Sequence, residues 1–142
     1  MTPTGLDRLA QVATVLGALL TAGSVIVGLV TYRRSVTEQR QAAALGILHE
    51  YLKLSVEHPE LASRERGQAI DASYDAFVTH ALATAETAWA LVGDDRRWDR
   101  SIGAVVLPHR EYLTQGVLHC ENYQTEFLQY LRERVPGVQC AP

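Results

Sequence analysis

Small and hydroxyl-bearing side chains recur on one face of an uncharged stretch near the N-terminus. Residues 9–32 carry no charged side chain, and heptad numbering places small residues at two positions of every heptad within the stretch. We call this set the small-residue stripe: Thr14, Gly17, Thr21, Ser24, Gly28 and Thr31. Small side chains let helix backbones approach, and hydroxyls can bond a neighbouring helix or replace part of an ion's hydration shell. The stripe therefore predicts helix packing or a pore lining, while a plain anchor with an accidental stripe is the third interpretation.

The heptad register of the stripe extends beyond the uncharged stretch in both directions. Asp7 shares the position of Thr14, and in a pore its copies would form an acidic ring at the outer mouth that favours cations. Towards the C-terminus the same register reaches larger apolar residues, at Leu45, Leu52 and Val56. Water favours apolar burial there, so the register predicts a homo-oligomer held by one continuous helix face.

Arginines gather at one predicted helix end. Arg96, Arg97 and Arg100 lie within five residues, although the chain has 13 basic and 16 acidic side chains and a net charge of -3. Arginine side chains bind anions through several donors at once, and symmetric copies would multiply the cluster. The cluster predicts an anionic-ligand site, and a solvated helix end is the alternative interpretation.

The sequence lacks the usual catalytic and metal-binding signatures. It contains no glycine-rich phosphate loop, no GxSxG and no HExxH. Its densest group of metal-type ligands has no zinc spacing: His109, His119, Cys120 and Glu121. Asp71 and Asp75 have no partner pattern and are predicted on a solvated helix face. We therefore expect no enzyme activity, no catalytic residues, no metal and no cofactor.

The uncharged stretch is long enough to span a bilayer as a helix. Arg33, Arg34 and Arg40 follow the stretch and only Arg8 precedes it, so the positive-inside rule predicts an outside N-terminus and a cytoplasmic C-terminal part. In that reducing compartment, Cys120 and Cys140 are expected to be free thiols. The tail after Pro136 is expected to be poorly ordered.

The periodicity predicts an all-α fold. One helix should run from near residue 6 to near residue 57, because its first strong breaker is Pro59. Further helices are predicted near residues 65–92, after a cap at Asp94 or Asp95, and near 122–135, with Pro108 interrupting the third. The domains are then 1–32, the N-terminus and transmembrane helix, and 33–142, a cytoplasmic helical domain. The latter comprises a stalk helix at 33–58, a helical bundle at 65–135 and a tail at 136–142.

This layout of one span, a helical stalk and a small helical domain resembles the small membrane effectors of bacterial anti-phage systems. These include the CRISPR-associated pore proteins and the channel component of Hailong systems. The resemblance implies an oligomeric ion channel in the lipid of the bacterial inner membrane. A cytoplasmic nucleotide, oligonucleotide or soluble defence partner would gate it. The alternative is a membrane-tethered helical adaptor that docks a soluble partner without conducting.

Overall fold

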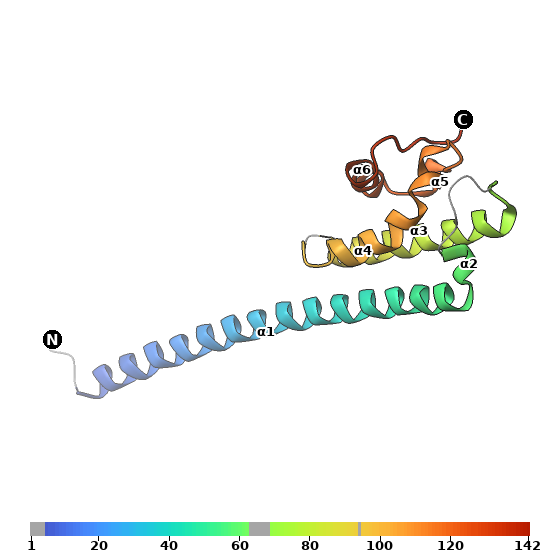
Figure 1. The fold of residues 1–142 in the computed structure, drawn as a ribbon. Coiled ribbons are helices and arrows are strands. Elements are labelled where there is room, and N and C mark those ends of the chain that lie inside the picture. Colours follow the sequence, from blue (N-terminus) through green and yellow to red (C-terminus); the bar gives the residue numbers. More distant parts are fainter. Residues whose placement is uncertain (1–4, 63–68, 94) are drawn as a thin grey trace. The chain divides into compact units, whose positions relative to one another are not determined.

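A computed structural model of the chain describes residues 5–62, 69–93 and 95–142, and within the first helix it describes the side chains of residue 11 and of residues 13 onward. Every regular element in these ranges is helical, as predicted (Figure 1). The elements are α1 (Gly5–Glu57), α2 (Pro59–Ala62), α3 (Ala72–Val92), α4 (Asp99–Val106), η1 (Leu107–His109), α5 (Arg110–Thr114), η2 (Cys120–Asn122) and α6 (Thr125–Arg134). The chain forms two compact units, residues 1–39 and residues 40–142.

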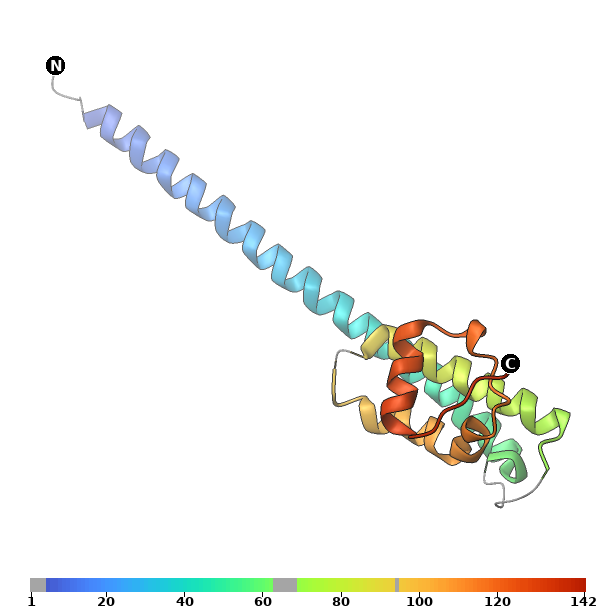
Figure 2. The same ribbon diagram turned by 90° about the horizontal axis from the view of Figure 1, so that it is seen from above.

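The long first helix is confirmed (Figure 2). Between Gly5 and Glu57 the chain has no proline, so every backbone N–H beyond the first turn can donate to the carbonyl four residues earlier. The helix ends at Glu57, two residues before Pro59, and the proline then opens α2, where its missing N–H leaves no hydrogen bond unmade. Within the described residues, α1 alone is long and apolar enough to cross a membrane, which fits a single-pass membrane protein.

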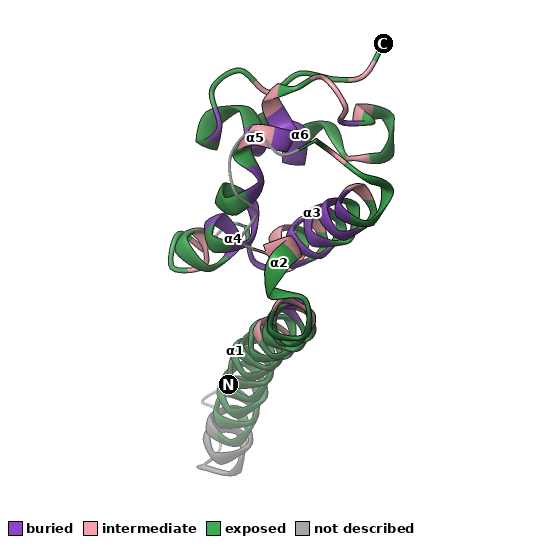
Figure 3. Ribbon diagram, turned by 45° about the vertical axis from the view of Figure 1, so that its right-hand side comes forward, coloured by how far each residue is buried: buried purple, intermediate pink, exposed green. Residues whose placement is uncertain are grey.

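The core of the C-terminal unit is built on α3. Its apolar positions recur at helical spacing and are buried against α4, α6 and the last turns of α1, whereas most of α1 is exposed (Figure 3). The largest fully buried side chains are Phe127, Leu82, Ile102, Leu113, Leu118, Leu131, His109, Val78, Val106 and Val135. Burying such side chains contributes about 1.5–3 kcal/mol each and drives this unit to fold.

The predicted start of the second helix, near residue 65, is wrong. Residues 63–68 lie outside the described part of the chain, and residues 69–71 are not helical. The α3 helix begins at Ala72 because the Asp71 carboxylate accepts a hydrogen bond from the Tyr74 N–H at 2.8 Å, which caps an otherwise unpaired donor. Asp71 is exposed, as expected, and caps the helix from this solvated position.

The turn between α3 and α4 differs from the predicted one. Gly93 ends α3 in a right-handed conformation, and a Cβ at this position would lie 2.6 Å from the Trp89 carbonyl oxygen, so the close approach requires glycine. The Asp95 carboxylate accepts from the Arg97 N–H within the turn and does not cap α4, whose first residue is Asp99. Asp94, the other predicted cap, lies outside the described residues.

The remaining helices follow the prediction with shifted boundaries. Pro108 ends the α-helical run of α4 and lies in η1, as expected of a residue without an N–H. The α6 helix starts at Thr125 rather than near residue 122, because residues 120–122 form the separate 3-10 turn η2. This unit is a small helical bundle, in agreement with the predicted fold class.

Candidate functional site

The small-residue stripe is fully exposed along α1. All six of its members, from Thr14 to Thr31, are exposed. At Gly17 and Gly28 no atom beyond the helix's own backbone and chain neighbours lies within 4 Å of where a Cβ would stand. The stripe therefore leaves room for a second helix backbone, although in a single chain no described part covers it.

Two hydroxyls of the stripe bond to their own helix. Thr21 Oγ1 donates to the Gly17 carbonyl oxygen at 2.9 Å, and Ser24 Oγ donates to the Leu20 carbonyl oxygen at 2.9 Å. A serine or threonine inside a helix often bonds the carbonyl four residues back, so the sequence contained a signal that the interpretation above did not use. These donors need no partner helix, while the lone pairs of the hydroxyl oxygens stay available to accept from water or contact a cation.

The heptad register of the stripe continues on both sides of it, to Asp7 before it and to Leu45, Leu52 and Val56 after it. The side chain of Asp7, the predicted pore mouth, lies outside the described side chains. On the C-terminal side, the side chains of Leu45, Leu52 and Val56 are 60%, 58% and 79% exposed. The core-facing positions of the same helix are different residues, Ala44, Leu48 and Tyr51. The last turns of α1 thus carry one apolar face packed in the bundle and a second apolar face in contact with solvent.

An apolar groove adjoins this second face. It has a volume of about 350 Å³ and lies between the last turns of α1 and α4. Its lining residues are Leu45, Leu48, His49, Tyr51, Leu52, Ser101, Ala104 and Val105. The groove extends the uncovered apolar surface from one helix to two, which suits the docking of another helix.

The arginines of the predicted anionic site lie in different surroundings. Arg97 pairs with Asp95, with 2.6 Å between Nη2 and Oδ2, and this contact lowers the pKa of Asp95 and raises that of Arg97. Arg96 lines a polar pocket of about 420 Å³, while Arg100 is exposed and is not among the residues lining it. Only Arg96 of the three therefore reaches the pocket.

The polar pocket combines aromatic surface with charges of both signs. Arg134 lies 5.6 Å from the centre of the Tyr130 ring and also donates to Asp99. The full lining is Trp89, Gly93, Arg96, Asp99, Ile102, Tyr130, Glu133 and Arg134. The Tyr130 hydroxyl is buried with no hydrogen-bond partner in the described part of the chain, and burial, together with the nearby Asp99 charge, raises its pKa to about 12. Arg134 was not predicted here, because it comes from α6, far along the chain from Arg96.

A buried histidine is a feature that the sequence did not reveal. His109 is 1% exposed, and its two ring nitrogens lie 3.2 Å from the Tyr74 hydroxyl and 3.4 Å from the Tyr51 hydroxyl. A neutral imidazole has one donor and one acceptor, so one hydroxyl accepts and the other donates. Burial without a counter-charge lowers the pKa of His109 to about 4. The ring is thus neutral at pH 7, and it contributes to the packing of the core rather than to a surface site.

Beside this histidine, Asp75 is not on a solvated face as expected. The Tyr112 hydroxyl donates to Asp75 Oδ1 at 2.6 Å, and burial together with this contact raises the pKa of Tyr112. A short bond from a phenol to a carboxylate is among the stronger hydrogen bonds in proteins. It ties α5 to α3.

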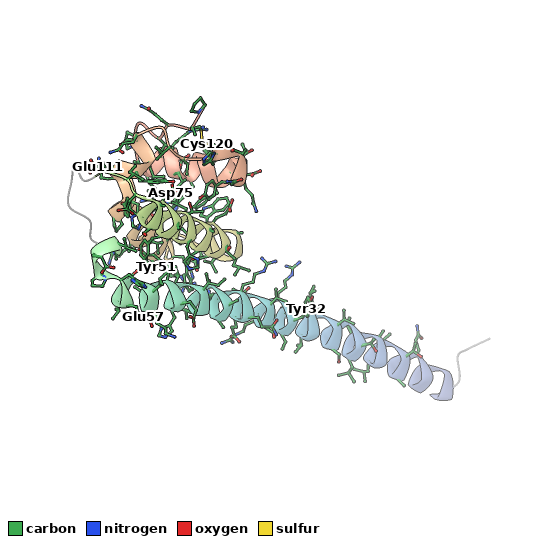
Figure 4. All side chains as sticks on the ribbon, turned by 90° about the vertical axis from the view of Figure 1, so that its right-hand side faces the viewer. Tyr32, Tyr51, Glu57, Asp75, Glu111 and Cys120 are labelled. Atoms are coloured by element: carbon green, nitrogen blue, oxygen red, sulfur yellow. A yellow bond between two sulfur atoms is a disulfide. The ribbon has the colours of Figure 1, made fainter. Side chains whose placement is uncertain are left out.

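In the oxidised form that the structure describes, the two cysteines are bonded rather than free, and the tail is attached to the bundle, so both expectations are corrected for this form. Cys120 and Cys140 form a disulfide, with Cα atoms 5.4 Å apart (Figure 4 labels Cys120). The backbone of the tail also pairs with the loop before η2, through the bridge between Leu118 and Cys140. A predicted compartment does not tell which cysteines are neighbours, and the fold brings these two together across 20 positions.

No family model, curated protein or solved structure matches this chain. Function must therefore be inferred from the exposed stripe, the groove and the pocket themselves.

Proposed function

We propose that this chain is a single-pass membrane protein that self-associates through the small-residue stripe and conducts ions. The observation that carries the proposal is the exposed stripe, which is uncharged, unhindered and in register with the exposed Leu45, Leu52 and Val56. In lipid, bulky apolar side chains gain no hydrophobic free energy by packing against another helix instead of against lipid tails, whereas small residues allow close packing of the backbones. In water, the large apolar residues of the same register gain by burial against another copy.

Conduction is supported by the state of the stripe's hydroxyls. Because Thr21 and Ser24 donate to their own helix, their oxygens present lone pairs outward and act as acceptors. A ring of such oxygens can replace part of a cation's hydration shell. A ring of Asp7 side chains at the mouth would add to the preference for cations, and Asp7→Asn would then reduce this cation preference.

The orientation that we propose places the N-terminus outside and the bundle in the cytoplasm of a bacterial inner-membrane protein. Arg33, Arg34 and Arg40 support it, since the rule counts basic residues near the span and gives acidic ones little weight. The pairing of Arg34 with Glu38, at 3.0 Å, therefore does not weaken the argument.

The bundle would receive the gating signal in this proposal. Arg96 and the aromatic wall formed by Trp89 and Tyr130 support a nucleotide or oligonucleotide ligand in the polar pocket, because a base can stack on the rings while an arginine binds phosphate. Resemblance of layout alone supports the role of an anti-phage effector, and a soluble defence partner is the other source of the signal. The proposal includes no enzymatic step.

A membrane-tethered adaptor is the second candidate. The apolar groove between α1 and α4 favours it, because a partner's amphipathic helix could occupy about 350 Å³ there without any pore. In that case, the stripe serves packing alone.

Planar-bilayer recording of the full-length protein, alongside native mass spectrometry, tests the proposal. Wild type should show stepwise currents and a mass above that of the monomer. Thr21→Leu should lower the conductance with assembly intact, whereas the matched control Ala22→Leu, off the stripe, should not. If wild type assembles but never conducts, with or without nucleotides, short oligonucleotides or a soluble partner, the adaptor function replaces the channel. A monomer in mild detergent contradicts self-association itself.

A further inference from the structure

The disulfide closes a segment of the chain that contains all of α6. Cys120 lies in η2, before the helix, and Cys140 lies in the tail after it. Val135 is 1% exposed and is the last fully buried side chain, so the core itself holds the chain up to that residue. Beyond Val135, other contacts must hold the tail.

Only a few contacts hold the tail besides the disulfide, as far as the described residues show. The Gln139 N–H donates to the Leu113 carbonyl oxygen at 2.9 Å, and the Ala141 N–H donates to the Leu118 carbonyl oxygen at 2.8 Å. Val138 is partly buried against the core. Two backbone hydrogen bonds and one partly buried side chain make a weak attachment for a chain end, which frays easily.

The disulfide joins an exposed residue to a partly buried one. Cys140 is exposed and Cys120 is partly buried, so the disulfide lies at the surface of the bundle rather than in its core. A surface disulfide that joins a chain end to the bundle is a candidate for thiol exchange.

We propose that Cys120 and Cys140 form a reversible redox site that fastens the C-terminal tail when oxidised and releases it when reduced. The proposal rests on the cytoplasmic location of the bundle proposed above, where small thiols are abundant. The tail covers the end of α5 and the loop after it, residues 113–118, in the oxidised form and uncovers them in the reduced form.

The exchange conserves atoms and electrons. A small thiolate attacks Cys140 Sγ, the bond between the two protein sulfurs breaks, and Cys120 leaves as a thiolate that takes up a proton. A second small thiol then attacks the external sulfur of the mixed disulfide and releases Cys140 as a thiol. The protein gains two electrons and two protons, and the two small thiols become one small disulfide. Oxidation is the reverse, with a small disulfide as the electron acceptor.

The first test counts thiols in the folded, full-length protein at a series of ratios of reduced to oxidised glutathione. Labelling with a polyethylene-glycol maleimide should show two thiols at the reducing end and none at the oxidising end, with full return on reversal. Cys140→Ser, the matched control, should show one modifiable cysteine that never forms the internal bond. A disulfide that yields only after the protein is denatured overturns the proposal.

The second test measures the attachment of the tail by hydrogen exchange. Reduction should speed exchange of the Gln139 and Ala141 amides by about tenfold or more, because the disulfide then no longer restricts local opening of the tail. The Val135 amide, bonded to the Leu131 carbonyl oxygen at 2.8 Å, serves as the internal control and should not change. The Cys120→Ser/Cys140→Ser double variant should match the reduced form. Equal protection of the tail in both forms overturns its release.

The third test uses acid-quenched cells. Both thiols should be free in untreated cells and joined after brief exposure to diamide. A bond already present in untreated cells overturns the reversible role and assigns the bundle to an oxidising compartment. A failure of the channel proposal is distinct from either outcome, since missing conductance leaves the thiol counts unchanged.

Discussion

At the centre of the C-terminal unit, the His109 ring contacts two tyrosine hydroxyls and almost no water. Its pKa falls from 6.5 to about 4 because burial disfavours the charged ring. The folded state therefore binds fewer protons than the unfolded state between these two values. Stability from this residue is fully present above pH 6.5 and is lost as the pH falls towards 4.

We predict that acidification from pH 7.5 to pH 5 lowers the free energy of unfolding of the bundle by about 2 kcal/mol through His109. Urea titrations followed by circular dichroism at each pH measure the change. His109→Gln should flatten this dependence, and His80→Gln, at an exposed position on α3, should leave it unchanged. An equal slope in the His109 variant would assign the pH dependence to other groups.

A second prediction for single residues concerns the hydrogen bond from the Tyr112 hydroxyl to Asp75. Tyr112→Phe removes a donor to a carboxylate and leaves that carboxylate partly buried, so unfolding should become easier by about 2 kcal/mol. Thermal and urea unfolding measure the loss, and Tyr32→Phe, at an exposed position, is the control. A loss no larger than that of the control would show that water replaces the hydroxyl at Asp75.

Sequence reasoning could not have found either contact. Tyr74 and Tyr51 lie 35 and 58 residues from His109, and Asp75 lies 37 residues from Tyr112. Periodicity assigns such residues to an apolar face but does not choose partners across helices. The polar pocket escaped prediction for the same reason, because Arg134 lies on α6 and Arg96 lies in the turn between α3 and α4.

At the scale of elements, the sequence predicted the long helices α1 and α3, the helix α4 and the helix α6, but it missed the short α2 and η2 and the starting residues of α3 and α6. The α1 helix has no breaker before Pro59, so periodicity and propensity agreed over its whole length. The starts of α3 and α6 depended on one side-chain cap at Asp71 and on the η2 turn. These are single local contacts, and a periodic pattern averages over them.

We predict that Gly17→Leu/Thr21→Leu disrupts assembly, since two large side chains on the stripe hold apart backbones that must otherwise pack closely. Native mass spectrometry in mild detergent should shift from oligomer towards monomer. A matched pair off the stripe, Ala22→Leu/Gly23→Leu, should retain the oligomer, because the space beside Gly23 is also open. Unchanged mass in the stripe variant would place the interface elsewhere on the protein.

At the scale of the whole molecule, the disulfide between Cys120 and Cys140 is a covalent constraint that the prediction of a reducing compartment did not anticipate. It joins positions 20 residues apart, and closing a loop of that length removes conformational freedom from the unfolded chain. The same bond thus limits both the unfolded ensemble and the freedom of the folded tail.

We predict that Cys120→Ser/Cys140→Ser lowers the free energy of unfolding of the bundle by about 3 kcal/mol. Urea unfolding under non-reducing conditions measures it, and wild type with excess reductant should give the same value. If reduced wild type stays as stable as the oxidised protein, the unfolded chain already keeps these positions close together.

Residues 120–140 also form a covalent ring, and α6 lies inside it. Arg132 and Arg134 are exposed on that helix, within reach of a trypsin-like protease. A single nick there opens the ring but creates no separate fragment, because the sulfur bond still joins the two sides of the cut. The nicked protein should therefore run as one chain on a non-reducing gel and lose a C-terminal peptide only when reductant is added.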